Sequence, residues 1–415
     1  MSVFHYQNNI LHIESMSTRV LALDYGTPLY VYSRQAIEQA WHGYADTLGD
    51  RGLVCYAVKA NSNLAVLNIL ARLGSGFDIV SIGELERVLA AGGQADRVVF
   101  SGVAKQADDL KRALQVGIRC FNVESLAELR VLNTVAGSMD LQAPVSIRVN
   151  PDVDAKTHPY ISTGLKHNKF GIDIKEAEKV YHEADRLPHI RVVGVDCHIG
   201  SQITTLEPFM DALDRLLQLV DRLADQGIVL EHLDVGGGIG VQYQESDTVP
   251  ALSDYVSQIL AKIGKRPQQL ILEPGRSIVA KAGAFLTKVV YLKETADHHF
   301  AIVDGGMNDL IRPALYQAWQ EIKPVKQRFG ESVRWDIVGP ICETADFLGH
   351  DRLLTLQQGD VVAVMDSGAY GFVMSSNYNA RNRAAELVID GDQVHVARRR
   401  ETIKDQMALE TILKS

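Results

Sequence analysis

Short apolar segments alternate with amphipathic helical patterns eight times between about residues 50 and 275. The apolar runs have the length of strands buried on both faces, and the stretches between them have helical spacing. Eight strand–helix units in ~225 residues predict a closed (β/α)8 TIM barrel, with an open doubly wound sheet as the alternative. The predicted strands are Leu53–Val58, Phe77–Val80, Val98–Phe100, Arg119–Val123, Val145–Val149, Val192–Cys197, His232–Val235 and Leu270–Leu272.

Helix signals support this alternation. Ser81 and Ser125 each stand three residues before a glutamate, which is the pattern of a capping box at a helix start. The apolar spacing of residues 209–225 indicates another helix, and we expect Pro208 at its first position. The segments between the predicted strands therefore carry their own helix starts.

After residue 276 helical patterns become rare, and predicted strands follow one another with Gly and Asp between them. This pattern is typical of an all-β domain, either a barrel or a sandwich. The alternating segments Ile10–Glu14 and Leu29–Ser33 are expected to join it. We therefore expect the barrel to span residues 31–275 and the β domain to combine residues 1–30 with 276–415. The strands predicted after residue 276 are Ala284–Leu292, Phe300–Asp304, Arg334–Val338, Val361–Asp366, Glu386–Ile389 and Gln393–Ala397.

Composition narrows the classes of function. The chain of 415 residues carries 42 Lys and Arg against 51 Asp and Glu, a net charge of −9, with one basic block at residues 398–400. Nucleic-acid binding needs clustered cations, so it is not expected. The four cysteines are far apart without a Cys-x-x-Cys pair, which indicates neither a disulfide framework nor a metal site. No apolar run approaches the ~20 residues of a membrane span and no export signal is visible, so we expect a cytoplasmic protein without membrane contact.

Lys59 follows the apolar run of the first predicted strand. In TIM barrels, function resides at the carboxyl ends of the strands. Desolvation and nearby cations can lower the pKa of a lysine at such a position and make its amine reactive. The plainer interpretation is a solvated lysine at a strand end.

The sixth and seventh predicted strands end in His198–Gln202 and Gly236–Gly240. Adjacent glycines let backbone amides approach an anion, although they also suit a tight strand–helix turn. A dinucleotide fingerprint matches poorly, because its third glycine position falls on Val241. His198 alone would more simply be a hydrogen-bonded core histidine.

The eighth predicted strand ends in Glu273-Pro274-Gly275-Arg276. A buried carboxylate is costly without a cationic or protonated partner. For Glu273 that partner could be a ligand, or simply an ion pair with Arg276 or with Arg148.

One ligand satisfies all four strand ends. Pyridoxal 5′-phosphate offers an aldehyde to Lys59, a phosphate to the glycine loop and Ser201, and a flat ring to His198. Glu273 would keep its pyridine nitrogen protonated, which makes the ring a stronger electron sink. We therefore predict a pyridoxal-phosphate site in the barrel. Its predicted contacts are Lys59, His198, Ser201, Gly237, Gly238, Glu273, Gly275 and Arg276.

Nine stretches of the chain also match a known family in that family's order. They are Tyr56–Asn61, Gly76–Ser81 with Gly83–Leu85, Lys169–Ile172, His198–Gln202, Gly236–Gly238, Glu273–Arg276, Arg312–Tyr316, Gly339–Thr344 and Gly368–Gly371. On these stretches, which span nearly the whole sequence, the chain resembles the fold-type III pyridoxal-phosphate decarboxylases, most closely the branch acting on meso-2,6-diaminopimelate.

The resemblance implies decarboxylation of meso-2,6-diaminopimelate to L-lysine and carbon dioxide, the last step of lysine biosynthesis. It implies an obligate homodimer whose active site lies at the interface, where Cys342 and Glu343 reach the partner's cofactor. Cys342 is implied as the proton donor, although a free cysteine is more often an inert apolar group.

The distal end of such a substrate carries a carboxylate and an ammonium group. Arg276 and Arg312 can pair with the carboxylate, and by resemblance Glu343 binds the ammonium. The same resemblance implies Tyr316 as a further substrate contact and Tyr370 as a contact of both substrate and cofactor. Arg312 could instead form a surface salt bridge of little energetic weight.

Other families share the scaffold. Ornithine, arginine and carboxynorspermidine decarboxylases are the nearest alternatives, but their substrates give Arg312 no distal carboxylate to bind. Alanine racemase needs a second base facing the ring, which the pair Cys342 and Glu343 does not match. A cofactor-binding regulator without turnover could consist of the barrel alone.

The polar insert from His158 to Lys169 is a candidate lid over the site.

Overall fold

The computed structural model describes residues 3–154 and 169–413, so the candidate lid lies almost entirely outside the described residues. The chain divides into two compact units. The barrel unit comprises Glu38–Gln242 and Asp247–Ile278, and the β unit comprises Met1–Ile37, Tyr243–Ser246 and Val279–Ser415. The expected boundaries, after residues 30 and 275, lie a few residues earlier. The short segment Tyr243–Ser246 was not expected in the β unit, and the guanidinium of Arg312 stacks over the Tyr243 ring at 4.9 Å.

The barrel unit is built on eight parallel strands. Each pairs with its neighbour in chain order, and β13 also pairs with β5, so the sheet closes on itself. Closure rules out the open doubly wound sheet and confirms the predicted TIM barrel. A two-residue strand, β10 (Ile172–Asp173), extends the edge beside β9. The barrel strands are β5 (Gly52–Ala57), β6 (Gly76–Ile79), β7 (Val98–Phe100), β8 (Cys120–Val123), β9 (Ala143–Asn150), β11 (Ile190–Asp196), β12 (His232–Asp234) and β13 (Gln269–Leu272).

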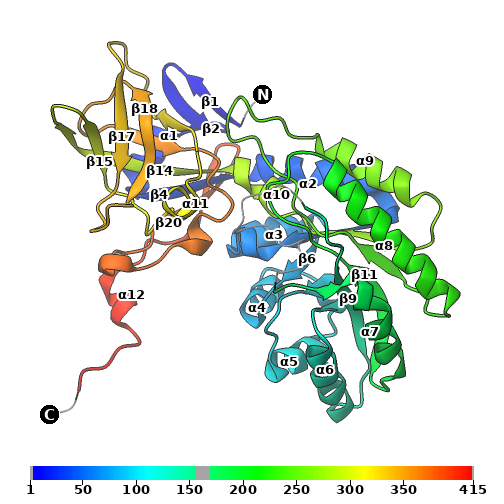
Figure 1. The fold of residues 1–415 in the computed structure, drawn as a ribbon. Helices are drawn as coiled ribbons and strands as arrows, with labels where there is room; N and C mark the ends of the chain where they lie inside the picture. Colours follow the sequence, from blue (N-terminus) through cyan, green and yellow to red (C-terminus); the bar gives the residue numbers. More distant parts are fainter. Residues whose placement is uncertain (1–2, 155–168, 414–415) are drawn as a thin grey trace. The chain divides into compact units, whose positions relative to one another are not determined.

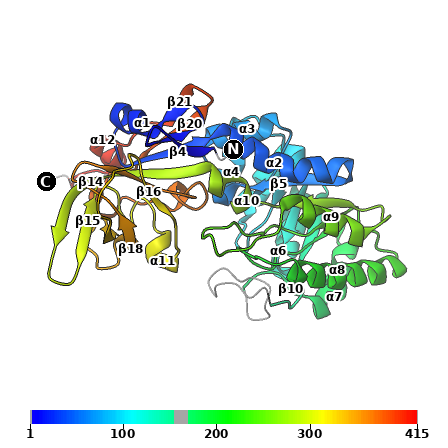
Figure 2. The ribbon, with the colours of Figure 1, turned by 90° about the horizontal axis from the view of Figure 1, so that it is seen from above.

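Helices surround these strands (Figures 1 and 2). Ser81 and Ser125 cap α4 and α6 by accepting from the backbone amides of Glu84 and Glu128, as predicted. Each glutamate, however, accepts from the amide one residue before the cap rather than from the cap itself. The helices are α2 (Arg34–Leu48), α3 (Leu64–Arg72), α4 (Ile82–Ala90), α5 (Ala107–Val116), α6 (Leu126–Ser138), α7 (Ile174–Arg186), α8 (Glu207–Asp225), α9 (Leu252–Ile263) and α10 (Arg276–Val279).

The β unit centres on a nine-stranded sheet in which β4 lies between β14 and β20. A small antiparallel sheet at the amino end packs its apolar side chains into the same core, which includes Leu11, Ile13 and Leu286. The strands are β1 (Phe4–Gln7), β2 (Ile10–Ile13), β3 (Met16–Ser17), β4 (Leu29–Ser33), β14 (Gly283–Glu294), β15 (His299–Val303), β16 (Ile322–Pro324), β17 (Val333–Val338), β18 (Phe347–Leu354), β19 (Val361–Val364), β20 (Ala385–Asp390) and β21 (Gln393–Arg398). The helices are α1 (Thr18–Tyr25), α11 (Arg312–Tyr316) and α12 (Ile403–Met407).

The structure adds strand β18, which the sequence did not suggest. Its central residues, Gly349 to Arg352, are glycine and polar residues that do not show the apolar alternation of a strand. The strand forms because it pairs along most of its length with β17 (Val333–Val338), and a side chain at Gly349 would clash with Arg352.

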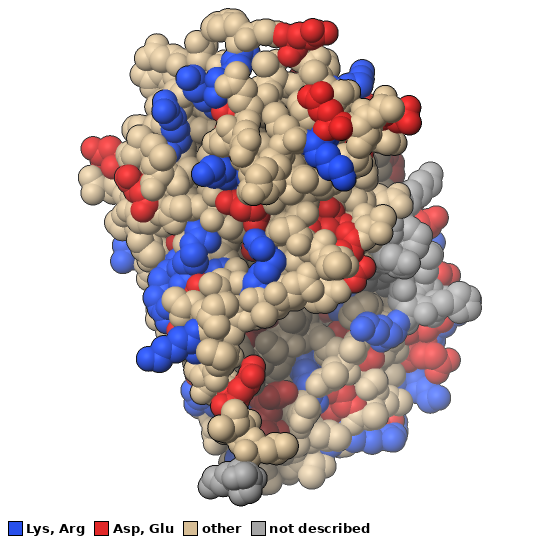
Figure 3. All heavy atoms as spheres, turned by 90° about the vertical axis from the view of Figure 1, so that its left-hand side faces the viewer, with Lys and Arg blue, Asp and Glu red and all other residues tan. Residues whose placement is uncertain are grey.

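Acidic and basic side chains are intermingled on the face drawn in Figure 3. Within the described ranges, no helix has the length and apolar character needed to cross a membrane.

Candidate active site

The carboxyl ends of four barrel strands carry the side chains predicted to bind a cofactor. Lys59 lies in the short 3-10 helix η2 (Val58–Ala60) directly after β5, and Glu273 directly follows β13. His198 follows β11, and Gly236–Gly238 follow β12. Because the strands are parallel, these segments share one edge of the barrel. The structure therefore brings the four strand ends to the same face of the barrel unit.

Lys59 is paired with a carboxylate that the sequence analysis did not single out. Its Nζ donates to Oδ2 of Asp78 at 2.8 Å, and the Asp78 side chain is fully buried in β6. The side chain of Lys59 is 34% exposed, so the protein holds the amine while a ligand can still reach it. Asp78 lies in one of the family-matching stretches, but an acid inside an apolar strand gives no sign of the direction it faces.

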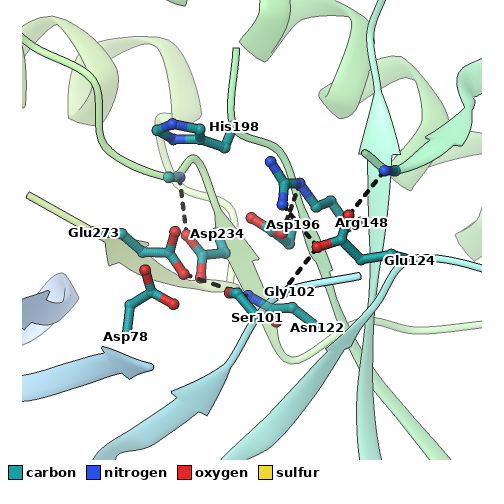
Figure 4. Close-up of polar contacts among 12 residues, drawn as sticks. Asp78, Ser101, Gly102, Asn122, Glu124, Arg148, Asp196, His198, Asp234 and Glu273 are labelled. Carbon is teal, nitrogen blue, oxygen red and sulfur yellow. Dashed lines mark hydrogen bonds and ion pairs between the residues drawn. The ribbon is translucent and has the colours of Figure 1, made fainter. Parts of the chain in front are cut away.

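A buried group of carboxylates lies near this pair. Asp196, Asp234 and Glu273 each place an oxygen within 4.8 Å of the other two. Figure 4 shows Asp78, Asp234 and Glu273 pointing toward one another. Burial, and then the charge of Asp234, raise the pKa of Glu273 well above its usual value, and burial raises the pKa of Asp234 to about 6. This acidic group is therefore short of positive charge and favours a proton or a cationic ligand.

Within the described residues, Glu273 forms neither of the ion pairs that were considered for it. Its Oε1 accepts from Nδ2 of Asn122 at 3.3 Å. Arg148 instead pairs with Glu124 at 2.9 Å and lies 3.7 Å from Asp196. A proton shared with the neighbouring carboxyl group of Asp234, or a cationic ligand, is therefore left as the partner of the Glu273 carboxyl group.

His198 is held as a neutral ring. Its Nδ1 accepts from the backbone amide of Gly237 at 3.3 Å, which places the ring proton on Nε2. Burial, followed by the charges of Lys59 and Arg148, lowers the pKa of His198 well below 6.5. A neutral imidazole with one nitrogen fixed can present its face to a flat ligand without adding charge.

The glycine loop is shaped by close approach of neighbouring backbones. A Cβ on Gly237 would lie 2.0 Å from the carbonyl oxygen of Glu273, and one on Gly238 would lie 2.2 Å from that of Gly200. Gly238 also has φ +112°, which side chains rarely allow. The packing therefore explains the glycines as a tight turn. The backbone amides of Gly236 and Gly237 donate to the side chains of Asp234 and His198, so the anion-binding interpretation of this loop stays a prediction.

A cation and a hydroxyl lie at the same edge. Nη2 of Arg276, the first residue of α10, donates to Oγ of Ser201 at 3.0 Å. Gly275, immediately before it, packs against Ala57 and Ala60 beside Lys59. Arg276 and Ser201 thus form a donor pair suited to a phosphate or carboxylate.

These residues fit pyridoxal phosphate. Within the described chain, the buried oxygens Asp78 Oδ1, Asp196 Oδ1 and Asp234 Oδ2 have no hydrogen-bond partner, and the excess acid suits a protonated ring nitrogen. An amine, a neutral aromatic ring and a donor pair surround that acid. The donor set matches an aldehyde, a flat ring and a phosphate in one molecule.

The β unit carries the five remaining predicted residues. Arg312 begins α11 and is only 6% exposed, so it is not the surface salt bridge that was considered. Tyr316 ends the same helix. Tyr370 has φ +54°, a left-handed conformation that is strained for a bulky residue and recurs at functional sites.

Cys342 and Glu343 lie on an exposed loop after β17. Cys342 is exposed with its backbone amide donating to Asn379 at 3.0 Å, which excludes the buried, inert cysteine. Glu343 accepts from the hydroxyl of Tyr378 at 2.5 Å. Tyr378 gave no sequence signal of its own.

Asp346 organises this loop, and the sequence analysis also missed it. Its carboxylate is buried and accepts from the backbone amides of Met307 and Ile341, each at 2.6 Å. A Cβ on Gly339 would lie 2.5 Å from that carboxylate. Asp346 therefore fixes the backbone directly before Cys342. Its position four residues after Cys342 is the only sequence cue.

Comparison with known proteins agrees with this geometry. Residues 34–280 match the family model described as pyridoxal-dependent decarboxylase, pyridoxal binding domain. A diaminopimelate decarboxylase of Pseudomonas aeruginosa is 60% identical to the chain over 414 residues, covering 100% of both proteins.

Two solved structures are similar over nearly their whole length. A diaminopimelate decarboxylase of Helicobacter pylori, complexed with L-lysine, has a TM-score of 0.91 and 44% identity, covering 95% of this chain and 99% of that one. One from M. jannaschii, also in complex with L-lysine, has a TM-score of 0.93 and 38% identity, covering 99% and 98%. Both barrel and β unit therefore have counterparts in these proteins.

Proposed function

Because the chain belongs to the diaminopimelate decarboxylase family, we propose that it removes carbon dioxide from meso-2,6-diaminopimelate and leaves L-lysine. The identity extends over the full length, and the structures of two relatives contain L-lysine, the product of this reaction. The observation that carries the proposal is the pair of Lys59 and Asp78, 2.8 Å apart, at the barrel edge that also carries a buried acidic group.

Lys59, Glu273 and His198 would hold pyridoxal phosphate, with Arg276 and Ser201 at its phosphate. Pyridoxal phosphate supplies an electron sink for the electron pair left when carbon dioxide departs. Glu273 would keep a proton between its carboxylate and the ring nitrogen of the cofactor. Burial and the neighbouring acids raise the pKa of Glu273, so a proton at this position is favoured. Asp78 holds the Lys59 amine when that amine is not engaged.

We place Cys342 as the donor of the proton that replaces the lost carboxylate. Two observations support this role: Cys342 is exposed, and Asp346 holds the backbone of the residue before it by accepting from the amide of Ile341. Glu343 would accept from the distal ammonium group of the substrate. Four free cysteines, one of them exposed, also support a reducing, cytoplasmic setting.

Arg312 is expected to bind the distal carboxylate of the substrate. We expect Arg312→Ala to raise KM for meso-2,6-diaminopimelate at least ~10-fold, since a charged hydrogen-bonded pair is lost. A matched control is Arg352→Ala, because Arg352 also stacks on an aromatic ring of the β unit, Trp319, at 4.5 Å. Steady-state carbon dioxide release, with ornithine as a second substrate, measures both variants. Unchanged KM in Arg312→Ala, or equal turnover of ornithine, would contradict the assignment.

We also propose that the enzyme is a homodimer with shared active sites, in which Cys342 and Glu343 serve the partner's cofactor. The exposure of both residues in the single chain supports this arrangement. Mixing the inactive variants Lys59→Ala and Cys342→Ala after unfolding and refolding should restore roughly a quarter of wild-type activity, because half of the dimers regain one intact site of two. Sedimentation of the mixture gives the dimer fraction. A dimer that stays inactive would show that each chain completes its own site.

A further inference from the structure

A hollow lies at the amino-terminal edge of the barrel, opposite the edge that carries Lys59. It has a volume of about 530 Å³, within the range of small-molecule sites. The amino-terminal edge of a TIM barrel normally serves stability rather than chemistry. The residues that line it are Trp41, Ala45, Asp46, Leu48, Gly49, Asp50, Gly52, Leu53, Val54, Leu73, Gly74, Arg97, Arg119 and Gln269. We call it the amino-edge bowl.

The floor of the bowl is polar where a barrel interior is usually aliphatic. Cys55, Val99 and Ile271 belong to the apolar cluster inside the barrel. Side chains on a strand alternate, so Leu53 and Gln269, two residues before Cys55 and Ile271, face the same way. Arg97 ends the short 3-10 helix Ala95–Arg97 before β7 and lines the bowl with them. Branched apolar residues dominate such layers in most barrels. Here the layer nearest the amino-terminal edge presents the guanidinium of Arg97 and the side-chain amide of Gln269 to the bowl.

The bowl is rich in hydrogen-bond donors. Arg97 donates to the carbonyl of Gly74 at 2.5 Å, and Arg119 donates to the side chain of Gln269 at 2.5 Å. Among the described residues, neither arginine forms an ion pair with a carboxylate. The buried atoms Nε of Arg119 and Nε1 of Trp41 have no hydrogen-bond partner there. Buried donors of this kind are normally satisfied, which favours an acceptor, from water or from a ligand, close to these two side chains.

The two arginines are neighbours. Arg97 directly precedes β7 and Arg119 directly precedes β8, and the amide of Arg119 donates to the carbonyl of Val98 at 2.9 Å. Two guanidiniums on adjacent strand starts can share one oxyanion. Asp46 and Asp50, both exposed, also line the bowl. These acids would repel a polyanion, so the ligand should carry little charge beyond its oxyanion group.

We propose that the amino-edge bowl is a second binding site, for a small molecule that carries a single carboxylate or phosphate group. Arg97 and Arg119 hold the oxyanion, and the ring of Trp41 lines the bowl from the side of α2. The site is separate from the pyridoxal-phosphate edge and does not depend on the proposed reaction.

The test uses the cofactor-loaded enzyme, so that the phosphate site of the active centre is filled. Trp41 is one of three tryptophans and lines the bowl, so its fluorescence reports binding locally. Titration with inorganic phosphate, and separately with acetate, should give a saturable change that Trp41→Phe removes. The stronger of the two responses identifies the head group. Arg97→Gln and Arg119→Gln should each raise the Kd at least ~10-fold.

Arg51→Gln is the matched control, because Arg51 lies beside the bowl, is exposed and does not line it. It removes the same charge and should change the Kd less than ~3-fold. Arg119→Lys, which keeps the charge, should recover part of the affinity, and the unfolding midpoint of every variant shows whether the barrel is intact. No saturable Trp41 response to either anion, or the same response in the Arg97 and Arg119 variants, would mean that the bowl holds only water.

Discussion

Replacing Lys59 with alanine is expected to lower kcat for diaminopimelate decarboxylation by at least ~1000-fold, because no other amine replaces a covalent catalyst. The fold should persist, since the Lys59 side chain is partly exposed and lies in a short helix after β5. The cofactor should then bind more weakly. Carbon dioxide release and the unfolding midpoint measure the two effects separately.

Lys59→Arg is the decisive control for this prediction. Arginine keeps the positive charge and can still pair with Asp78, but its guanidinium cannot act as an amine nucleophile. We expect the arginine variant to be as inactive as the alanine variant. Substantial turnover by Lys59→Arg would mean that Lys59 acts only through its charge on Asp78, and the assignment of the reactive amine would be wrong.

Glu273→Gln is expected to lower kcat ~100-fold or more, because the carboxylate that keeps the ring nitrogen protonated is lost. The same change should stabilise the cofactor-free protein at neutral pH. The pKa of Glu273 is raised in the folded state, so the folded protein binds more protons than the unfolded one above about 4.5. Stability from this group is therefore present at low pH and is lost as the pH rises.

Denaturant unfolding between pH 5 and 8 checks the prediction for Glu273. The wild-type protein without cofactor should lose stability over this range, and Glu273→Gln should lose less. Asp234, whose pKa is raised to about 6, contributes a fall of the same sign. Glu86→Gln is the control, because Glu86 is an exposed acid paired with Arg112 and its pKa is lowered. A steeper fall in Glu273→Gln than in the wild type would contradict the acidic-group account.

The architecture of the barrel could be predicted because each of its parts has a local signal. Eight apolar runs, the serine caps at Ser81 and Ser125, and the glycines after β12 are all visible within a few residues of sequence. The strand-end chemistry followed from the rule that parallel strands place their carboxyl ends together. Lys59, His198 and Glu273 were found in this way, and the structure places them on one edge.

The partners of these residues could not be predicted, since they depend on which way a strand residue faces. Asp78, Asp196 and Asp234 lie in or at the ends of apolar strands, and nothing local shows that their side chains gather around Glu273. Strand β18 was missed for a similar reason, because its pairing with β17 outweighs its polar centre. Long-range packing, not local pattern, determines both.

Attachment of the cofactor tests the central claim most directly. The enzyme is incubated with pyridoxal phosphate, reduced with borohydride, digested and mapped by mass spectrometry. We predict that one peptide, the one containing Lys59, carries the reduced cofactor, and that Lys59→Arg carries none. Labelling of a different lysine in the wild-type protein, or no labelling at all, would contradict the account.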